Sequence, residues 1–226
     1  MEKRVLRGAA FILEGDTEKI FYLALLEYLC KKHSGWRLEK EFDPKTGEVR
    51  YFLESEEERT LIKLFVVGTI SQLTNSAQWF EKSCHKGFPS VKWTVFLCYD
   101  TDSYTSPITK FYEGDWEELR KSLSRSRAER IVDLAAQADI EDIMLLDSDS
   151  VFRFLNMEPC EIPTGAKGKR RMKRLFRMKG SGVAYHEGTR ASALIHALNF
   201  DALIERSPLR FDLVEALLFP ERPEPV

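Results

Sequence analysis

Residues 9–18 read AAFILEGDTE, an apolar run that ends abruptly at Glu14. The apolar half predicts a buried β-strand, because it is short, continuous and bounded by a glycine. The polar half predicts the start of a helix that runs to about His33, with Asp16 or Thr17 as its N-cap. An acidic residue between a buried strand and a helix is a recurrent way to hold a hard metal ion. Glu14 is therefore the first candidate site residue.

A second apolar run, at residues 94–102, reads TVFLCYDTD and ends in an Asp-x-Asp pair. Alternate side chains of an extended chain point the same way, so Asp100 and Asp102 can reach one ion. If the two strands are neighbours, three carboxylates meet at one sheet edge and can hold Mg²⁺ or Mn²⁺. Glu14 can instead handle a proton, because crowding by two other carboxylates favours its protonated form. Each motif alone is also compatible with a plain strand-to-helix turn or a solvated loop.

The rest of the chain alternates between strand and helix patterns. Further core strands are expected at 61–67 and 91–99, and a β-hairpin at 36–53 around a Pro/Gly turn. Segment 130–134 is compatible with a strand or a helix, and we favour a strand. The alternation predicts an α/β fold with a mainly parallel central sheet and helices on both faces. Ligands of such sheets bind at the carboxyl ends of the strands, where the acidic motifs lie. Helices are expected at 17–33, 70–82, 116–124, 140–155, 191–198 and 211–218.

A second acidic cluster lies within residues 139–149, where acidic and apolar residues alternate at helical spacing. This pattern indicates an amphipathic helix with a solvated acidic face. The alternative is that Glu141 or Asp142 completes a second metal site beside the strand-end carboxylates. The sequence leaves both interpretations open.

Size and composition restrict the class of protein. The 226 residues, 43% hydrophobic and 31% charged, suit one domain or a core with an appendage. We expect a metal-binding core at residues 1–157 and a small, basic, helical appendage at residues 158–226 packed on it. No apolar run is long enough to span a membrane and no secretory signal is evident, so a cytoplasmic location is expected. The four cysteines contain no Cys-x-x-Cys pair, which favours reduced, buried thiols.

The net charge of −2 does not indicate a polyanionic partner, but residues 167–179 carry eight basic residues and no acid. Lysine and arginine side chains bind nucleic-acid phosphates and release counterions. The segment therefore predicts contact with a nucleic-acid backbone. The alternative is a solvated helix face whose apolar residues pack inward. The predicted nucleic-acid-binding residues are Lys167, Lys169, Arg170, Arg171, Lys173 and Arg174.

Taken together, residues 11–19 (FILEGDTEK) and 97–102 (LCYDTD) resemble the Toprim fold of topoisomerases, bacterial primases and OLD-type nucleases. They are most similar to small bacterial Toprim-like proteins of phage-defence and abortive-infection systems. Segment 140–147 is similar to the acidic and apolar helix that follows in that group, so the resemblance covers roughly residues 8–155. The site residues it implies are Glu14 as metal ligand or proton-transfer group, Asp100 and Asp102 as Mg²⁺ ligands, and Glu141 as a further ligand.

The resemblance implies a nuclease that hydrolyses phosphodiester bonds of DNA or RNA with Mg²⁺ or Mn²⁺, in bacterial anti-phage defence. Its catalytic residues would be Glu14, Asp100, Asp102 and Glu141, with Asp142 as an additional metal ligand. The chain departs from the group in having His186 where a lysine is expected after Tyr185.

The chain also contains no Gly-x-x-x-x-Gly-Lys-Ser/Thr motif, so nucleotide hydrolysis would need a separately encoded ATPase. This departure supports an alternative hypothesis, a module that binds metal and nucleic acid but depends on that partner for activity. Nucleotidyl transfer, as in primases, is a third and weaker interpretation. A homo-oligomer is compatible with all three.

Overall fold

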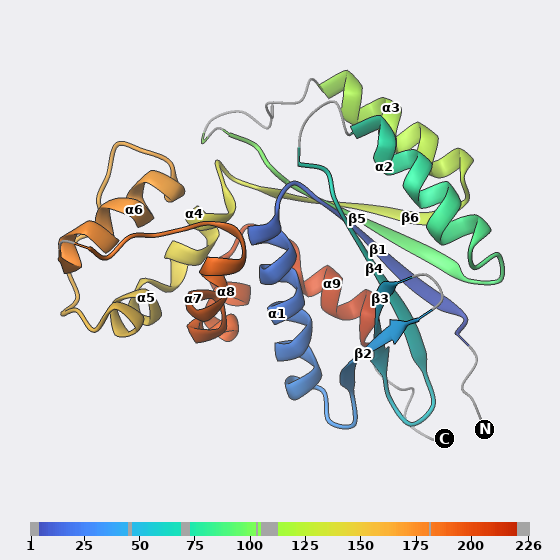
Figure 1. The fold of residues 1–226 in the computed structure, drawn as a ribbon, viewed down its shortest axis with the longest axis horizontal. Coiled ribbons are helices and arrows are strands. Elements are labelled where there is room, and N and C mark those ends of the chain that lie inside the picture. The colour runs from blue at the N-terminus through green and yellow to red at the C-terminus, as the bar shows by residue number, and fades with distance from the viewer. Residues whose placement is uncertain are drawn as a thin grey trace.

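The computed structural model describes residues 5–44, 47–68, 73–102, 104, 113–180 and 182–220. These residues form a mixed α/β fold around a six-stranded, mostly parallel sheet with strand order β2-β3-β4-β1-β5-β6 (Figure 1). Strands β4, β1, β5 and β6 are parallel, and β2 and β3 extend the sheet as an antiparallel hairpin. The predicted mainly parallel sheet is confirmed, and segment 130–134 is a strand. The strands are β1 (Arg7–Leu13), β2 (Arg37–Asp43), β3 (Glu48–Glu54), β4 (Arg59–Val66), β5 (Lys92–Asp100) and β6 (Ala128–Ala136).

Strand β1 lies inside the parallel part of the sheet, and its side chains are buried on both faces. Its residues 9–13 are at most 1% exposed, the pattern of a strand covered by helices on each side. Leu13 pairs with Val66 of β4 and with Cys98 of β5. The two strands that carry the acidic motifs are therefore neighbours, and Glu14 follows β1 at the edge where β5 ends.

Helices cover both faces of the sheet (Figure 1). Ala9 and Phe11 of β1 face the core beneath α1 and α9, whereas Ala10 and Ile12 face the core beneath α2, η2 and α3. Helices α4 to α8 gather beyond the carboxyl edge of the parallel strands. The helices are α1 (Asp16–Lys32), α2 (Leu73–Trp79), π-helical η2 (Phe80–Lys86), α3 (Glu113–Arg125), α4 (Ile140–Met144), η3 (Leu145–Asp147), α5 (Ser148–Leu155), α6 (Gly168–Lys179), η4 (Gly188–Ala191), α7 (Ser192–Ala197), α8 (Phe200–Arg206) and α9 (Phe211–Leu218).

Two predicted helices differ in detail from the structure. The single helix expected at 140–155 is broken at Asp147, whose carboxylate accepts hydrogen bonds from the backbone N–H groups of Ser150 and Asn199. An aspartate that caps a new helix competes with continuation of the old one. The helix expected at 70–82 continues as a π-helix to Lys86, and its first residues, 70–72, lie outside the described part of the chain.

The C-terminal helices complete the core on the α1 face. The ring centroid of Phe211 in α9 lies 5.9 Å from that of Phe21 in α1. Glu215 of α9 forms ion pairs with Lys32 at 2.8 Å and with His33 at 2.7 Å. Aromatic packing of this kind contributes stability beyond the buried area alone. Helix α9 is thus built into the core, and the division at residue 157 stays a prediction.

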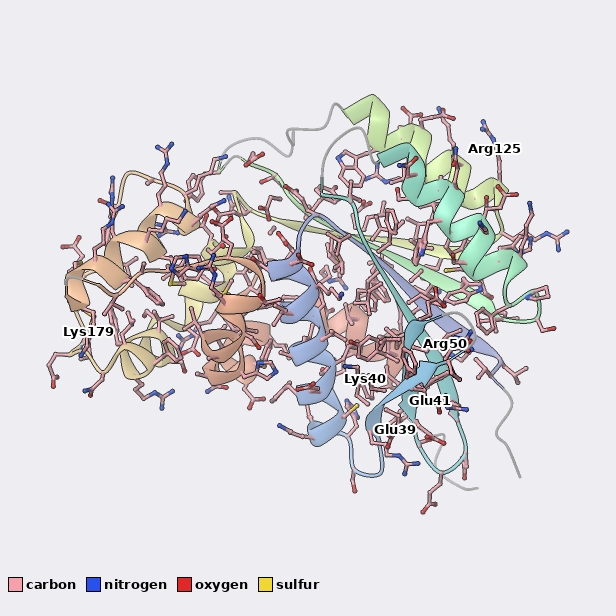
Figure 2. The ribbon with its side chains drawn as sticks, viewed as in Figure 1. Glu39, Lys40, Glu41, Arg50, Arg125 and Lys179 are labelled. Atoms are coloured by element: carbon pink, nitrogen blue, oxygen red, sulfur yellow. The ribbon has the colours of Figure 1, made fainter. Side chains whose placement is uncertain are left out.

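The β2–β3 hairpin presents a charged face that is balanced by ion pairs. The Lys63 side chain of neighbouring β4 is only 6% exposed and forms an ion pair with Glu48 at 2.7 Å. Figure 2 shows Glu41 and Arg50 on this hairpin, whereas Lys179 lies at the opposite end of the molecule, on α6. The hairpin therefore stabilises the edge of the sheet away from the acidic motifs.

Gly8 allows a close approach of β1 to Trp93, and this generates a test of the core. A Cβ at Gly8 would lie 2.6 Å from Trp93 Cε3 and 2.8 Å from a Val91 methyl carbon. We expect Gly8→Ala to lower the free energy of unfolding by about 1–3 kcal/mol through overpacking, as measured by urea denaturation. Gly35→Asn, at an exposed turn with φ +86° and open space, is the control and should change it little. An unchanged Gly8→Ala midpoint would contradict the tight packing.

Candidate functional site

A pocket of about 820 Å³ opens at the carboxyl ends of the parallel strands. The buried part of its lining, called the floor, carries carboxyl side chains that follow β1 and β6 or lie on α1 and α4, beside Asp100 at the end of β5. The more exposed part, called the rim, carries basic side chains from the start of α6. This is the position at which sheets of this kind bind ligands. The charged residues that line it are Glu14, Asp16, Glu18, Asp100, Asp102, Asp139, Glu141, Lys167, Lys169, Arg170 and Glu187.

Glu14 joins the ends of two strands. Its side chain accepts a hydrogen bond from the backbone N–H of Asp100 at 3.1 Å. Its backbone N–H donates to the Cys98 carbonyl at 3.1 Å, and its carbonyl accepts from Gly68 at 2.9 Å. Glu14 is 9% exposed and lines the pocket. The predicted meeting of Glu14 and Asp100 at one sheet edge is therefore observed.

Asp100 ends β5 in the pocket floor. Its Oδ1 atom is buried and has no hydrogen-bond partner among the described residues. Burial raises its pKa from 3.8 to about 9, and repulsion from Glu18 and Glu141 adds to the effect. A carboxyl group with so high a pKa can hold a proton at neutral pH and donate it.

Asp102 corrects one premise of the sequence analysis. Its φ of 58° is in the left-handed region, so the Asp-x-Asp segment is not extended throughout. The Asp102 backbone N–H donates to the Ala138 carbonyl at 2.9 Å. Its Oδ1 accepts from Lys167 Nζ at 2.6 Å. Asp102 thus lines the pocket and forms an ion pair with Lys167 at the basic rim.

Glu18 is a buried pocket residue that the sequence analysis did not single out. It is 6% exposed and lies in the first turn of α1, three residues after the N-cap Gly15. Burial raises its pKa, and hydrogen bonds from the backbone N–H groups of Glu18 and Gly15 oppose the rise. The spacing Gly-x-x-Glu is that of a capping box with glycine at the cap, a signal that could have identified it.

Asp139 and Asp142 fix the start of α6. Asp139 accepts hydrogen bonds from the backbone N–H of Asp142 at 3.0 Å and of Lys169 at 3.1 Å. Asp142 accepts from the Gly168 N–H at 2.9 Å and forms an ion pair with Arg171. Two carboxylates at a helix N-terminus satisfy its free N–H groups and its dipole. The structure therefore gives Asp142, a predicted metal ligand, a structural set of partners.

Glu141 lies between these two aspartates and faces the pocket. It is 3% exposed, and its Oε1 accepts a hydrogen bond from the Tyr185 hydroxyl at 2.8 Å. Burial raises its pKa to about 7, repulsion from Asp139 adds to this, and the tyrosine bond opposes it. Glu141 can therefore exchange a proton near neutral pH. The role of Tyr185 was not predicted, because 43 intervening residues separate it from Glu141 in sequence.

The predicted nucleic-acid-binding residues form the first two turns of α6 and the residue before it. Most of them have partners within the chain. Lys169 and Lys173 pair with Glu187, and Arg174 donates to the Thr164 carbonyl at 2.8 Å. Because Lys167 and Arg171 pair with Asp102 and Asp142, acids from elsewhere in the chain neutralise much of the local excess of charge.

A metal ion would need several of these carboxylates to converge. Among the described residues, no group of three or more His, Cys, Asp and Glu side chains could hold one. Glu14 bonds to backbone, Asp102 to a lysine, and Asp142 to the start of α6. Three of the five predicted ligands therefore have partners within the chain, and the assignment of the five as metal ligands stays a prediction. Binding of Mg²⁺ or Mn²⁺ stays a prediction.

No family model and no curated protein matches the sequence. Solved structures that match include a futalosine hydrolase mutant of Helicobacter pylori strain 26695, at 8% identity, 85% coverage of each chain and a TM-score of 0.27. They also include the Campylobacter jejuni 5′-methylthioadenosine/S-adenosyl homocysteine nucleosidase, at 12% identity, 93% and 98% coverage and a TM-score of 0.28. The native H. pylori futalosine hydrolase matches at 10% identity, 95% and 97% coverage and a TM-score of 0.29. Likeness at this level assigns no activity to the chain.

These comparisons do not bear out the predicted identity. The neighbours are a hydrolase and a nucleosidase and not Toprim nucleases. The comparisons therefore contradict the predictions of a Toprim resemblance and of a metal-dependent nuclease in anti-phage defence. The alternative of a metal- and nucleic-acid-binding module stays a prediction. The short motifs misled because a strand-end acid before a helix recurs in many α/β sheets. The partners (DNA or RNA, a separate ATPase, a second copy) stay predictions.

A membrane-spanning helix was not expected, and the described part of the chain contains no helix long and apolar enough to be one.

The raised pKa of Asp100 predicts a pH-dependent effect on stability. Between pH 3.8 and 9 the unfolded chain loses the Asp100 proton while the folded chain retains it, so stability falls as the pH rises. We expect Asp100→Asn to increase the free energy of unfolding at pH 8 by about 1–3 kcal/mol, because an amide carries no such penalty. The gain should disappear near pH 4. Urea denaturation at both pH values measures it, with the exposed Asp149→Asn as control; a gain independent of pH would contradict the assignment.

Gly168 provides a second test of the site. A Cβ there would overlap the Asp142 backbone nitrogen and Asp139 Oδ1, so no other residue fits this approach of α6 to α4. We expect Gly168→Ala to displace the start of α6 and lower the free energy of unfolding by about 1–3 kcal/mol. Thermal unfolding measures the loss. Lys179→Ala, at the far end of the same helix, should lose much less, and equal losses would count against a specific clash.

Proposed function

We propose that this chain is a hydrolase that cleaves the glycosidic-type bond of a small anionic substrate, with Asp100 as its proton donor. The observation that carries the proposal is the Asp100 carboxyl group, which lines the pocket and has a buried Oδ1 without a hydrogen-bond partner among the described residues. Burial raises its pKa to about 9. A carboxylic acid that stays protonated at neutral pH is what glycosidic cleavage requires for its leaving group.

The acidic floor supports this class of reaction. Glycosidic cleavage develops positive charge on the sugar ring, and neighbouring carboxylates stabilise that charge. A reacting centre that gained negative charge would instead gain nothing from the carboxyl groups of Glu14, Glu18 and Asp139, which all line the pocket. The anionic part of the substrate therefore belongs near the basic rim, and the bond to be cleaved belongs deeper in the pocket.

The proton transfers can be assigned to named groups. Asp100 gives its proton to the leaving nitrogen or oxygen as the bond to the anomeric carbon breaks. A water molecule adds to that carbon and gives its proton to Glu141, whose pKa of about 7 leaves it largely ionised above neutral pH. The proton on Glu141 then returns through solvent to Asp100. The hydrogen bond from Tyr185 holds the accepting carboxylate in place.

Nucleoside 5′-monophosphates are the first substrates to assay, because they combine an N-glycosidic bond with a phosphate that suits the rim. The assay measures release of the free base by chromatography. We expect activity in the wild type and a loss of roughly 10²–10⁴-fold in Asp100→Asn. The rate should rise as Glu141 ionises through about pH 7 and fall as Asp100 loses its proton near pH 9.

Asp149→Asn, which removes an exposed acid of α5 that does not line the pocket, is the matched control and should retain full activity. The proposal fails if the wild type releases no base from any nucleoside 5′-monophosphate. It also fails if Asp100→Asn cleaves as fast as the wild type.

A further inference from the structure

We propose that Arg170 is the subsite that recognises the phosphate group of the substrate at the rim of this pocket. The inference concerns the same pocket as the proposed function, but it depends on anion binding and not on turnover. It also assigns anion binding to one residue of the basic segment at 167–179 and not to the whole segment.

The contacts of the basic segment at 167–179 distinguish Arg170 from the other basic residues of the pocket. Two lysines that line the pocket already have acidic partners: Lys167 pairs with Asp102 and Lys169 with Glu187. Both acids line the same pocket, so each pair adds little net charge to it. Arg170 is the third basic residue of the lining, and among the described residues no ion pair or hydrogen bond of its side chain is found. Its guanidinium is the cation at the rim that remains available.

The position of Arg170 is fixed by its backbone. It lies in the first turn of α6, and the N–H groups of Gly168 and Lys169 just before it are held by Asp142 and Asp139. Because there is no space for a Cβ at Gly168, this turn cannot slide along α4. The long side chain therefore extends from a rigid base, which reduces the ordering cost of binding.

The charge distribution selects the class of ligand. A guanidinium presents parallel N–H donors that match two oxygens of a phosphate. The carboxyl floor repels an anion, so a phosphate that enters the pocket stays at the rim beside Arg170. The uncharged remainder of the substrate then points toward Asp100. A phosphate monoester on a small molecule fits this arrangement, because Arg170 is the one cation of the lining without an acidic partner among the described residues.

Titration calorimetry with inorganic phosphate tests the subsite without any assumption about turnover. We expect Arg170→Gln to weaken phosphate binding about 10-fold or more, and Arg170→Lys to lose part of the affinity because an ammonium lacks the fork of donors. Arg177→Gln is the matched control: it removes the same charge from an exposed position of the same helix that does not line the pocket. It should bind phosphate as the wild type does.

Three results would overturn the inference. They are wild-type affinity in Arg170→Gln, equal weakening by Arg177→Gln, or acetate bound more tightly than phosphate by the wild type. Thermal unfolding of each variant verifies that the fold is intact, which an exposed position such as Arg170 should preserve. If phosphate binding requires Arg170 but no glycosidic bond is cleaved, the proposed function fails and the subsite stands. If cleavage depends on Asp100 while Arg170→Gln leaves phosphate binding unchanged, the proposed function stands and the subsite fails.

Discussion

The burial of β1 between two parallel neighbours is the constraint on which the rest of the structure depends. A strand whose residues 9–13 are almost fully buried must have a helix layer on each face and a partner strand on each side. That requirement brings the ends of β1 and β5 to one edge, and β6 continues the parallel order beside β5. Acids that follow these strands then share one pocket, whatever their separation in sequence.

The concentration of carboxyl groups has an energetic cost, and the chain offsets most of it locally. Asp139 and Asp142 receive the N–H groups at the start of α6, Asp102 receives a lysine, and Glu141 receives a tyrosine hydroxyl. Asp100 is the exception, because its Oδ1 is buried without a partner in the described structure. A group left in so unfavourable a setting, where its neighbours are satisfied, is characteristic of a functional position.

Local patterns in the sequence predicted the elements well and the contacts poorly. The strand after Gly8, the helix after Gly15 and the hairpin are determined by periodicity and turn residues, so they could be read from the chain. The left-handed conformation of Asp102 could not, because it depends on a hydrogen bond to Ala138 on another segment. The same holds for the partners of the basic helix. Much of its apparent excess of charge is neutralised in the fold, since Asp102, Asp142 and Glu187 pair with its basic residues.

These non-local pairings also decide between classes of chemistry that a list of residues leaves equivalent. Carboxylates at a strand edge were first interpreted as ligands, which requires them to be ionised and to converge on one point. In the structure they line one pocket and have separate partners. Burial and repulsion together raise the pKa of Asp100, whose Oδ1 has no partner among the described residues. A carboxylic acid with a raised pKa, such as Asp100, beside other carboxyl groups favours a reaction that transfers a proton and develops a cation. The fold therefore gives each acid of the motif a different chemical environment by placing it beside a different neighbour.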